Sequence, residues 1–509
     1  MQRMKQTATR VYAWFESRLQ LEGPVKEAVL HQVPRNTASW WYVFGSAAFT
    51  LLFLQIFTGI LLALVYVPSG GEAWNSLNVL NHQIPLGWFL RAMHGWGSNF
   101  MVAIVLIHMA QVFLFGAYKF PRELTWILGV FLLLMTLGMA FTGQVLRFDQ
   151  DAYWGLGIGA SILSRVPFIG GGLVHLLLGG PIIAGATLSR FFALHVFVIP
   201  GTMLLFVFLH VWMVLKLGVN DWPMPGRIVR RETYIEEYHH LARTNGLPFV
   251  PGAFWKDLIF SGAILAAVAV CAVVFGPFGP SGQPDPSIIQ TVPKPDFFFL
   301  WIYTILSYLP PQMETSFILI VPILAIAVLL ALPLVASEGE KSWHRRPVAL
   351  LVVSTLAVSW GVLTRLGTTT PWSPHMSAWS GDPLPVNRVY DATPLVRQGA
   401  VVFQAKQCRN CHSIGGSGGE RGPTLDAVAT RLTIDQMRFK VVSGGGNMPA
   451  YGKNLSPAEI EALVSFLETL HPANEPPAYD AARRTVEASL PANNTASASG
   501  LGANPGTKP

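Results

Sequence analysis

The sequence predicts an all-α protein, in which a bundle of seven transmembrane helices is followed by a small soluble helical domain. Only 12% of the 509 residues are charged, 51% are hydrophobic and the mean hydropathy is +0.42. A soluble protein needs more polar surface than this composition supplies. Seven apolar stretches are long enough to cross about 30 Å of hydrocarbon, where helices pair their own backbone groups. They lie at about 42–67, 92–117, 124–146, 191–215, 258–278, 317–336 and 348–366.

Lysine and arginine are distributed unevenly between the connecting segments, which predicts the orientation of the bundle. If the N-terminus is cytoplasmic, the inner segments hold 17 basic residues and the outer segments hold 5. We therefore expect a multi-pass protein of the inner (cytoplasmic) membrane, with its C-terminal domain on the outer, periplasmic side. The net charge of +7 does not indicate a nucleic-acid partner, because the basic residues lie between apolar stretches.

The second and fourth predicted spans carry two histidines each. His94 and His108 are 14 residues apart, and His195 and His210 are 15 residues apart. At 1.5 Å and about 100° per residue, each pair returns to nearly the same helix face, with its members about 21–22 Å apart. His94 then matches His195 in depth, and His108 matches His210. Each matched pair can bind one haem iron through neutral imidazoles. Four unrelated, hydrogen-bonded histidines are the alternative, which the depth match disfavours.

Glycines repeat at the same interval in the first and third spans. Gly45 and Gly59 are 14 residues apart, and so are Gly129 and Gly143. A missing side chain lets a flat macrocycle approach the backbone. We therefore expect Gly59 and Gly143 at an outer haem and the other two glycines at an inner haem. Close packing of helices is the alternative.

Two arginines lie just before the outer histidines. Arg91 precedes His94 by three residues and Arg190 precedes His195 by five. A guanidinium at either position could pair with a propionate of the outer haem. Anchoring at the membrane interface is the alternative for both.

A CxxCH motif in the C-terminal part, formed by Cys408, Cys411 and His412, predicts a covalently attached haem. The two thiols add to the haem vinyl groups and the adjacent histidine binds the iron. A zinc site would need a second pair of ligands, which is missing nearby. Met448, in the glycine-rich stretch GGGNMPAYG, is the candidate for the second axial ligand. With a closing amphipathic helix, these features resemble a small class I cytochrome c.

The membrane block resembles a known family. Residues 10–225 resemble cytochrome b6, and residues 225–370 resemble subunit IV, of the cytochrome b6f and bc1 quinol oxidases. The matching segments include VYAWFESRL, PRELTW, FTGQVL, DQDAYWG, TLSRFFALH and RRPVA. We expect a dihaem four-helix domain at 1–222, a three-helix domain at 223–370, a cytochrome c domain at 390–475 and, from its composition, a disordered tail at 476–509.

The resemblance implies oxidation of a membrane quinol at the outer face. The family's Pro-Glu-Trp-Tyr motif for this site reads Pro295-Asp296-Phe297-Phe298 here, which keeps a carboxylate and loses the tyrosine hydroxyl. Asp296 would accept the quinol proton, because a carboxylate in an apolar loop can have a raised pKa. Capping the next helix is the alternative role. The family's Pro-Trp after the third span is Arg147-Phe148 here, and Val43 replaces the cysteine that holds an extra inner haem.

The resemblance also implies the electron path and the partners. Electrons would cross two b haems to reduce quinone near the cytoplasmic face, or leave through the fused c haem, with protons released outside. Lys216 and Asp221, just past the fourth span, are candidates for inner proton handling, although a solvated loop is the simpler interpretation. The implied partners are a separate Rieske iron–sulfur protein, the membrane quinone pool, a cytochrome c or terminal oxidase, and a second copy of the complex.

A different function fits the same haem ligands. The chain would then be a dihaem membrane electron-transfer anchor, which links the quinone pool to another redox partner without a Rieske-dependent quinone cycle. A haem-bearing redox sensor, which would not turn over quinol, is a further alternative. The Pro295–Phe298 motif argues against the sensor.

Overall fold

The computed structural model describes residues 31–180, 183, 185–284, 293–370, 384–406, 408–419, 422–444, 448, 451–452 and 455–478, with 10, 13–14, 16–18 and 23 near the N-terminus. The predicted disordered tail lies outside these residues from 479 onward. The chain divides into two compact units, one containing residues 31–284 and 293–370 and the other containing residues 384–478.

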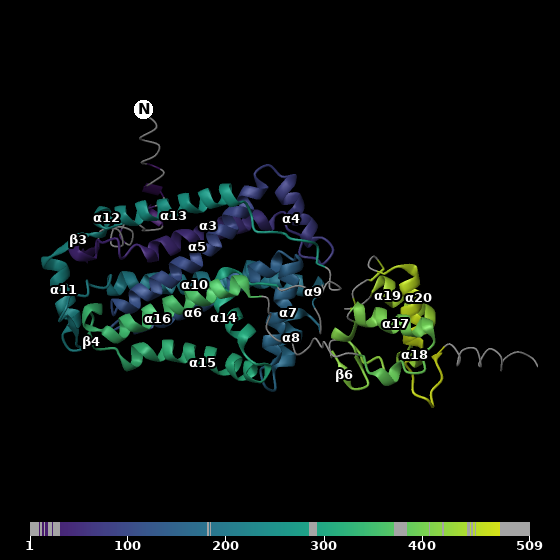
Figure 1. The fold of residues 1–509 in the computed structure, drawn as a ribbon. Coiled ribbons are helices and arrows are strands. Elements are labelled where there is room, and N and C mark those ends of the chain that lie inside the picture. The colour runs from purple at the N-terminus through teal and green to yellow at the C-terminus, as the bar shows by residue number, and fades with distance from the viewer. Residues whose placement is uncertain are drawn as a thin grey trace, which may run out of the picture. The chain divides into compact units, whose positions relative to one another are not determined.

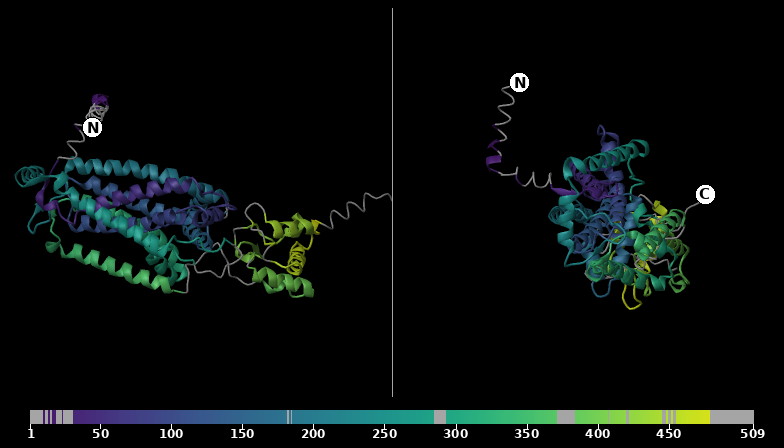
Figure 2. Two further views of the ribbon diagram at one scale, coloured as in Figure 1. Left: turned by 90° about the horizontal axis from the view of Figure 1, so that it is seen from above. Right: turned by 90° about the vertical axis from the view of Figure 1, so that its left-hand side faces the viewer.

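Seven helices in the described part of the first unit are long and apolar enough to cross a membrane. They are α3 (Phe44–Ala63), α5 (Gly87–Leu114), α6 (Glu123–Leu146), α9 with α10 (Gly185–Ala193 and Ile199–Leu217), α13 (Phe254–Phe275), α15 (Pro311–Val335) and α16 (Pro347–Thr369). They run side by side in Figures 1 and 2. Large apolar side chains such as Phe57, Phe208 and Val335 are exposed on the bundle, as expected for a lipid-facing surface. The predicted all-α transmembrane bundle is confirmed.

The spans that carry the four histidines are held to their neighbours by small and branched apolar side chains. Ala47 and Leu51 of α3 pack with Ile104 of α5 and Val268 of α13 in one buried cluster. On the other side, α6 packs against α10. This packing places the first and third spans beside the spans that carry the histidines.

The fourth span is not a uniform α-helix. Between α9 and α10, residues Leu194–Val198 form a π-helical turn. Pro200 lies two residues after this turn and has no N–H to bond to a carbonyl in it, which favours the wider turn. A π turn accommodates one extra residue. The 15-residue interval between His195 and His210 is therefore equivalent to the 14-residue interval in α5.

Shorter elements gather at the two ends of the bundle (Figure 1). One end carries the helices α4 (Ala73–His82), α7 (Gln150–Ser164), α8 (Gly170–Leu178) and α14 (Phe297–Tyr308). The other end carries α11 (Tyr234–Thr244), α12 (Phe249–Gly252) and two antiparallel ribbons, β1 (Gln32–Pro34) with β3 (Gly246–Pro248) and β2 (Ile228–Val229) with β4 (Gly339–Glu340). These ribbons join segments that are more than a hundred residues apart.

The second unit is a small helical domain. Its helices are α17 (Pro394–Ala405), α18 (Val428–Arg431), α19 (Ile434–Ser443) and α20 (Pro457–Glu468), and its one hairpin pairs β5 (Ser413–Ile414) with β6 (Ser417–Gly418) in the described residues. Thr433 and Ser456 form capping boxes that begin α19 and α20. The rings of Phe403 and Phe466 lie 5.4 Å apart where α17 packs on α20.

Candidate functional site

Two histidines face each other within the bundle. His94 of α5 and His195 of the π turn have ring centroids 6.3 Å apart, with ring planes at 76°. Two metal–imidazole bonds of about 2.0–2.1 Å each, together with the ring dimensions, account for a separation of this size. Thr58 Oγ1 lies 2.8 Å from His94 Nδ1, and Thr142 Oγ1 lies 2.9 Å from His195 Nδ1. The geometry fits a haem iron between the two Nε2 atoms.

The two threonines also determine the protonation of the rings. Thr58 donates its hydroxyl proton to the Leu54 carbonyl at 2.6 Å, and Thr142 donates to the Gly138 carbonyl at 2.8 Å. Each hydroxyl oxygen must therefore accept the imidazole Nδ1–H. The remaining Nε2 is unprotonated, which is the form that binds a metal.

No role was predicted for Thr58 or Thr142 from the sequence, although a repeated segment in the sequence marks both residues. Each threonine directly precedes one of the predicted glycines in a repeated Phe-Thr-Gly segment, at 57–59 and 141–143. A repeat at corresponding depths of the first and third spans indicates a shared role. The hydrogen bonds to histidines on other helices are what reveal that role.

All four predicted glycines lie against the predicted histidines. A side-chain carbon at each glycine would contact Cε1 of one ring, and the pairs are Gly59–His94 at 3.3 Å, Gly143–His195 at 2.9 Å, Gly45–His108 at 3.4 Å and Gly129–His210 at 3.6 Å. The distance at Gly143 is shorter than real carbon contacts allow, so only glycine fits there without a shift. The glycines therefore make room for the imidazole rings, and contact with a haem face stays a prediction.

The inner histidines have different surroundings. His108 Nδ1 is buried and has no hydrogen-bond partner within the described residues, in contrast to His94 Nδ1. A carboxylate also lies near this level, because Asp257 in the first turn of α13 accepts a hydrogen bond at 2.6 Å from Ser46, next to Gly45. Ionisable groups inside membrane spans are costly and usually functional.

The cavity at the outer histidine pair has a volume of about 280 Å³ and extends to Asp296. Arg91 also lines it and is buried, donating to Asn81 Oδ1 at 3.0 Å and to the carbonyls of Gly279, at 2.7 Å, and Phe278. Arg190 instead donates to the carbonyls of His175 and Leu176 at the end of α8. Of the two predicted propionate partners, the structure brings only Arg91 to this cavity.

Asp296 is the N-cap residue of α14, but its side chain does not bond to the helix backbone. Burial raises the pKa of Asp296, Arg147 lowers it and Asp149 adds to the increase. A half-buried carboxyl with a raised pKa can exchange protons with a bound molecule. The carboxyl side chain is therefore available to the cavity, as the quinol interpretation requires.

The residues beside Asp296 have other roles. Phe298 is buried against Val102 and Ala140, so it anchors α14 to α5 and α6 instead of lining the cavity. Pro295 directly precedes the N-cap. Arg147 lines the cavity, with its Nε 3.5 Å from the fully buried Asp149. The guanidinium that replaces the family's proline is therefore part of this site.

The CxxCH site lies in the second unit. His412 Nδ1 bonds to the Pro423 carbonyl at 2.8 Å, which leaves Nε2 for a metal. A side chain at Gly422 would overlap the His412 ring. Cys408 and Met448 both pack against the apolar core of this unit. The residues present fit a covalently attached haem.

Three family models match the chain. They are "Cytochrome b/b6/petB" over residues 29–218, "Cytochrome b(C-terminal)/b6/petD" over 285–380 and "Cytochrome C oxidase, cbb3-type, subunit III" over 394–467. These matches fall on the first four spans, two of which carry the histidines, on the last two spans and on the CxxCH unit.

Individual proteins agree with the family models. Cytochrome b6 of Synechococcus elongatus is 34% identical over 212 residues, which are 42% of this chain and 98% of that protein. A cytochrome bc complex cytochrome b subunit of Chlorobaculum thiosulfatiphilum is 36% identical over 211 residues, which are 41% of this chain and 49% of that protein. A solved chain titled "Hyperthermophilic respiratory Complex III" is similar with a TM-score of 0.61 and 26% identity, covering 70% of this chain and 91% of that one. The chain therefore belongs to the cytochrome b/b6 family and combines b6-like and subunit IV-like parts with a C-terminal cytochrome c domain.

Proposed function

We propose that this chain is the cytochrome b and c subunit of a quinol:cytochrome c oxidoreductase. It oxidises a membrane quinol at the outer face, moves electrons between two haem levels and delivers electrons through its cytochrome c domain, with protons released outside. Family membership and the likeness to a cytochrome bc complex subunit and a respiratory complex III chain support this proposal. The observation that carries it is the cavity shared by the outer histidine pair and Asp296.

Three haems are part of the proposal, two of b type and one of c type. When bound, they supply one-electron redox chemistry. The ligands would be His94 with His195, His108 with His210, and His412 with Met448, while Cys408 and Cys411 hold the c haem covalently.

Asp296 acts as the proton acceptor for the quinol. A quinol must lose its hydroxyl protons as it is oxidised, and the Asp296 carboxylate lies in the same cavity as the outer histidines. Pro295 and Phe298 position that carboxylate by beginning α14 and by anchoring it to the bundle. Arg91 holds the nearby loop through the Phe278 and Gly279 carbonyls, and a propionate partner role remains proposed for Arg91 and Arg190.

The proposal includes partners and a location. A Rieske iron–sulfur protein would accept the first electron, and a cytochrome c or terminal oxidase would take electrons from the fused c haem. The complex would be a homodimer in the cytoplasmic membrane, with the N-terminus in the cytoplasm and the cytochrome c domain on the periplasmic side. The distribution of basic residues supports this orientation.

The haem content and the turnover test the proposal separately. Purified protein should contain two b haems for each c haem by pyridine-haem spectra. Quinol turnover should require both Asp296 and the Rieske protein. A single b haem would contradict the two-level electron path. Full haem content with quinol-dependent haem reduction that needs no Rieske protein would instead support the electron-transfer anchor.

A further inference from the structure

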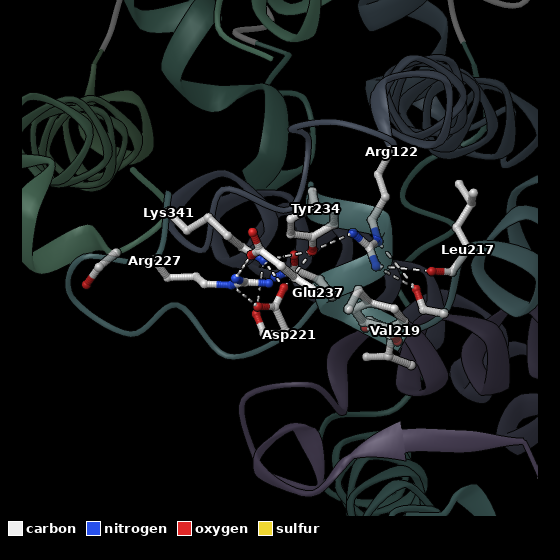
Figure 3. Close-up of polar contacts among 12 residues, drawn as sticks. Arg122, Leu217, Val219, Asp221, Arg227, Tyr234, Glu237 and Lys341 are labelled. Atoms are coloured by element: carbon white, nitrogen blue, oxygen red, sulfur yellow. Dashed lines mark hydrogen bonds and ion pairs between the residues drawn. The ribbon is translucent and has the colours of Figure 1, made fainter. Parts of the chain in front are cut away.

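A cluster at the end of the bundle that carries α11 and β4 shows how a buried ion pair is bonded in this protein. Lys341, which follows β4, is 0% exposed and pairs with Asp221, which follows α10 and is 2% exposed. The Tyr234 hydroxyl donates to Asp221 Oδ1 at 2.6 Å, and Arg227 donates to Oδ2 at 2.9 Å. Figure 3 shows these side chains converging from separate segments. The solvated-loop interpretation of Asp221 is therefore wrong, because a lysine 120 residues later buries it.

Arg147, between α6 and α7 at the other end of the bundle, is bonded differently. Its Nε is buried and has no hydrogen-bond partner in the described part of the chain. Asp149 Oδ2 lies 3.5 Å away, which is too far for a normal hydrogen bond. The Asp149 carboxylate is already bonded, because it accepts the backbone N–H groups of Ala152 at 2.9 Å and Ser281 at 3.0 Å. The Arg147 Nε–H is therefore a buried donor that the described residues leave unused.

The turn that follows Arg147 is held firmly in place. Phe148 has a positive φ of 42°, a backbone conformation that a bulky residue rarely adopts. Its ring is buried and packs edge-on against Tyr153 of α7, with centroids 6.3 Å apart. Strained backbone persists only where the surrounding packing enforces it, and such positions cluster at functional sites. The Arg147 side chain, which is only 20% exposed, is therefore fixed at the wall of the cavity that contains the outer histidine pair.

Four charged side chains act together at this cavity. Arg91, Arg147 and Asp296 line it, and Asp149 is the ion-pair partner of Arg147. With both carboxylates ionised, the two arginines balance them. When Asp296 takes a proton from a bound quinol, these groups gain one positive charge and the quinol becomes a monoanion. The Arg91 guanidinium already donates to Asn81 and to two carbonyls, so Arg147 is the cation with an unused donor for that anion.

We propose that Arg147 binds the quinol oxygen that has given its proton to Asp296, and so stabilises the quinol as its monoanion. The inference rests on the proposed function, which puts quinol oxidation in this cavity. In this step the quinol O–H bond breaks, an O–H bond forms on the Asp296 carboxyl, and the electron pair stays on the quinol oxygen. The anion gives an electron to the Rieske protein of the proposed function only afterwards. The family's proline at this position has no side-chain donor for such a role.

An arginine that only neutralises Asp149 is the competing explanation. Such a salt bridge would hold α6 to α7, and its loss would lower stability without changing what the cavity binds. A stronger pair of this kind lies nearby, because the Arg165 guanidinium, directly after α7, is 2.8 Å from the buried Glu314 of α15. Neither Arg165 nor Glu314 is among the described residues that line the cavity. Arg165 is therefore a matched control for loss of an arginine that pairs with a carboxylate.

Binding of an anionic ring tests the inference without turnover. The D296N complex has a neutral side chain in place of Asp296, as protonation would give. A hydroxynaphthoquinone with an alkyl tail, whose acidic hydroxyl is ionised at neutral pH, supplies the charge of the quinol monoanion, and its methyl ether is the neutral control. In calorimetric titrations of the full complex, D296N/R147Q should bind the hydroxynaphthoquinone at least about tenfold more weakly than D296N, as expected for a lost hydrogen bond to a charged group.

Two controls accompany this titration. The ether should bind D296N and D296N/R147Q equally, because it carries no charge. D296N/R147K keeps a cation at the cavity wall and should recover most of the affinity for the hydroxynaphthoquinone. Binding at any other site in the complex is common to all of these variants and does not affect their differences.

The rate of quinol oxidation gives a second readout. At a pH where Asp296 is ionised in both proteins, R147Q should lower kcat about tenfold and change the KM for quinol little, because the anion forms only after the proton leaves. A change in the pKa of Asp296 alone would not lower kcat, since a carboxylate with a higher pKa is a stronger base. R165Q should lower the unfolding temperature and leave kcat at the parental value.

Equal affinity of the hydroxynaphthoquinone for D296N and D296N/R147Q, or an unchanged kcat in R147Q, would overturn the inference. Should R147Q fail to fold, the D296N complex still decides, because it must bind the hydroxynaphthoquinone more tightly than the ether, and the reverse order would overturn the inference as well. Failure of the proposed function would appear differently. The unmutated complex with full haem content would not oxidise quinol, while the binding difference between D296N and D296N/R147Q would persist.

Discussion

Replacing Thr142 with valine should weaken the outer haem site specifically. Valine keeps the shape of threonine and removes the oxygen that accepts the His195 Nδ1–H at 2.9 Å. The imidazole would then have a buried, unsatisfied donor, which costs about 1–3 kcal/mol. The ring would also lose the contact that holds its tautomer. Losing such a partner of a metal-binding histidine typically lowers metal affinity about 10–100-fold, or about 1.4–2.8 kcal/mol.

The assay is a haem titration of the purified apoprotein, followed by redox difference spectra. T142V should bind one b haem normally and the second about 10–100-fold more weakly. The matched variant T142S keeps the hydroxyl and should bind both haems normally. The inner site is an internal control, because no hydroxyl holds His108 Nδ1 in the described residues. Equal affinity of both haems in T142V would refute the role assigned to the threonine.

Four further predictions follow from the two haem sites and the cavity. D296N should lower quinol turnover about 100-fold or more without changing haem content, whereas D296E should keep part of it, as measured by steady-state cytochrome reduction. Because proton acceptance needs the carboxylate, quinol turnover should rise with pH as Asp296 loses its proton at its raised pKa. The Arg147 charge lowers that pKa, so R147Q should raise the pKa further and shift the rise in turnover to higher pH in the same assay. G143A should lose outer haem, because its methyl would lie 2.9 Å from the His195 ring, while G129A, at 3.6 Å from His210, should keep the inner haem in difference spectra. C411A should greatly weaken haem staining of the denatured chain, which reports covalent attachment, and should leave the b haem spectrum unchanged.

The membrane architecture could be predicted from the sequence because it depends on local properties. Twenty-residue apolar runs determine spans by their length alone, and the depth of a histidine follows from its position in its own helix. The depth match of His94 with His195 therefore needed no knowledge of the packing. The CxxCH motif is local as well, because its ligands are adjacent in the sequence.

The tertiary structure decided everything that depends on which side chain meets which. Arg91 and Arg190 have similar positions before their histidines, yet one lines the cavity and the other binds the end of α8. Asp221 belongs to a polar loop in the sequence and becomes buried only because Lys341 reaches it from 120 residues away. Hydropathy and helical period are properties of one segment, and they carry no information about such pairings. Burial, tautomers and ion pairs arise between segments, so only the packed bundle determines them.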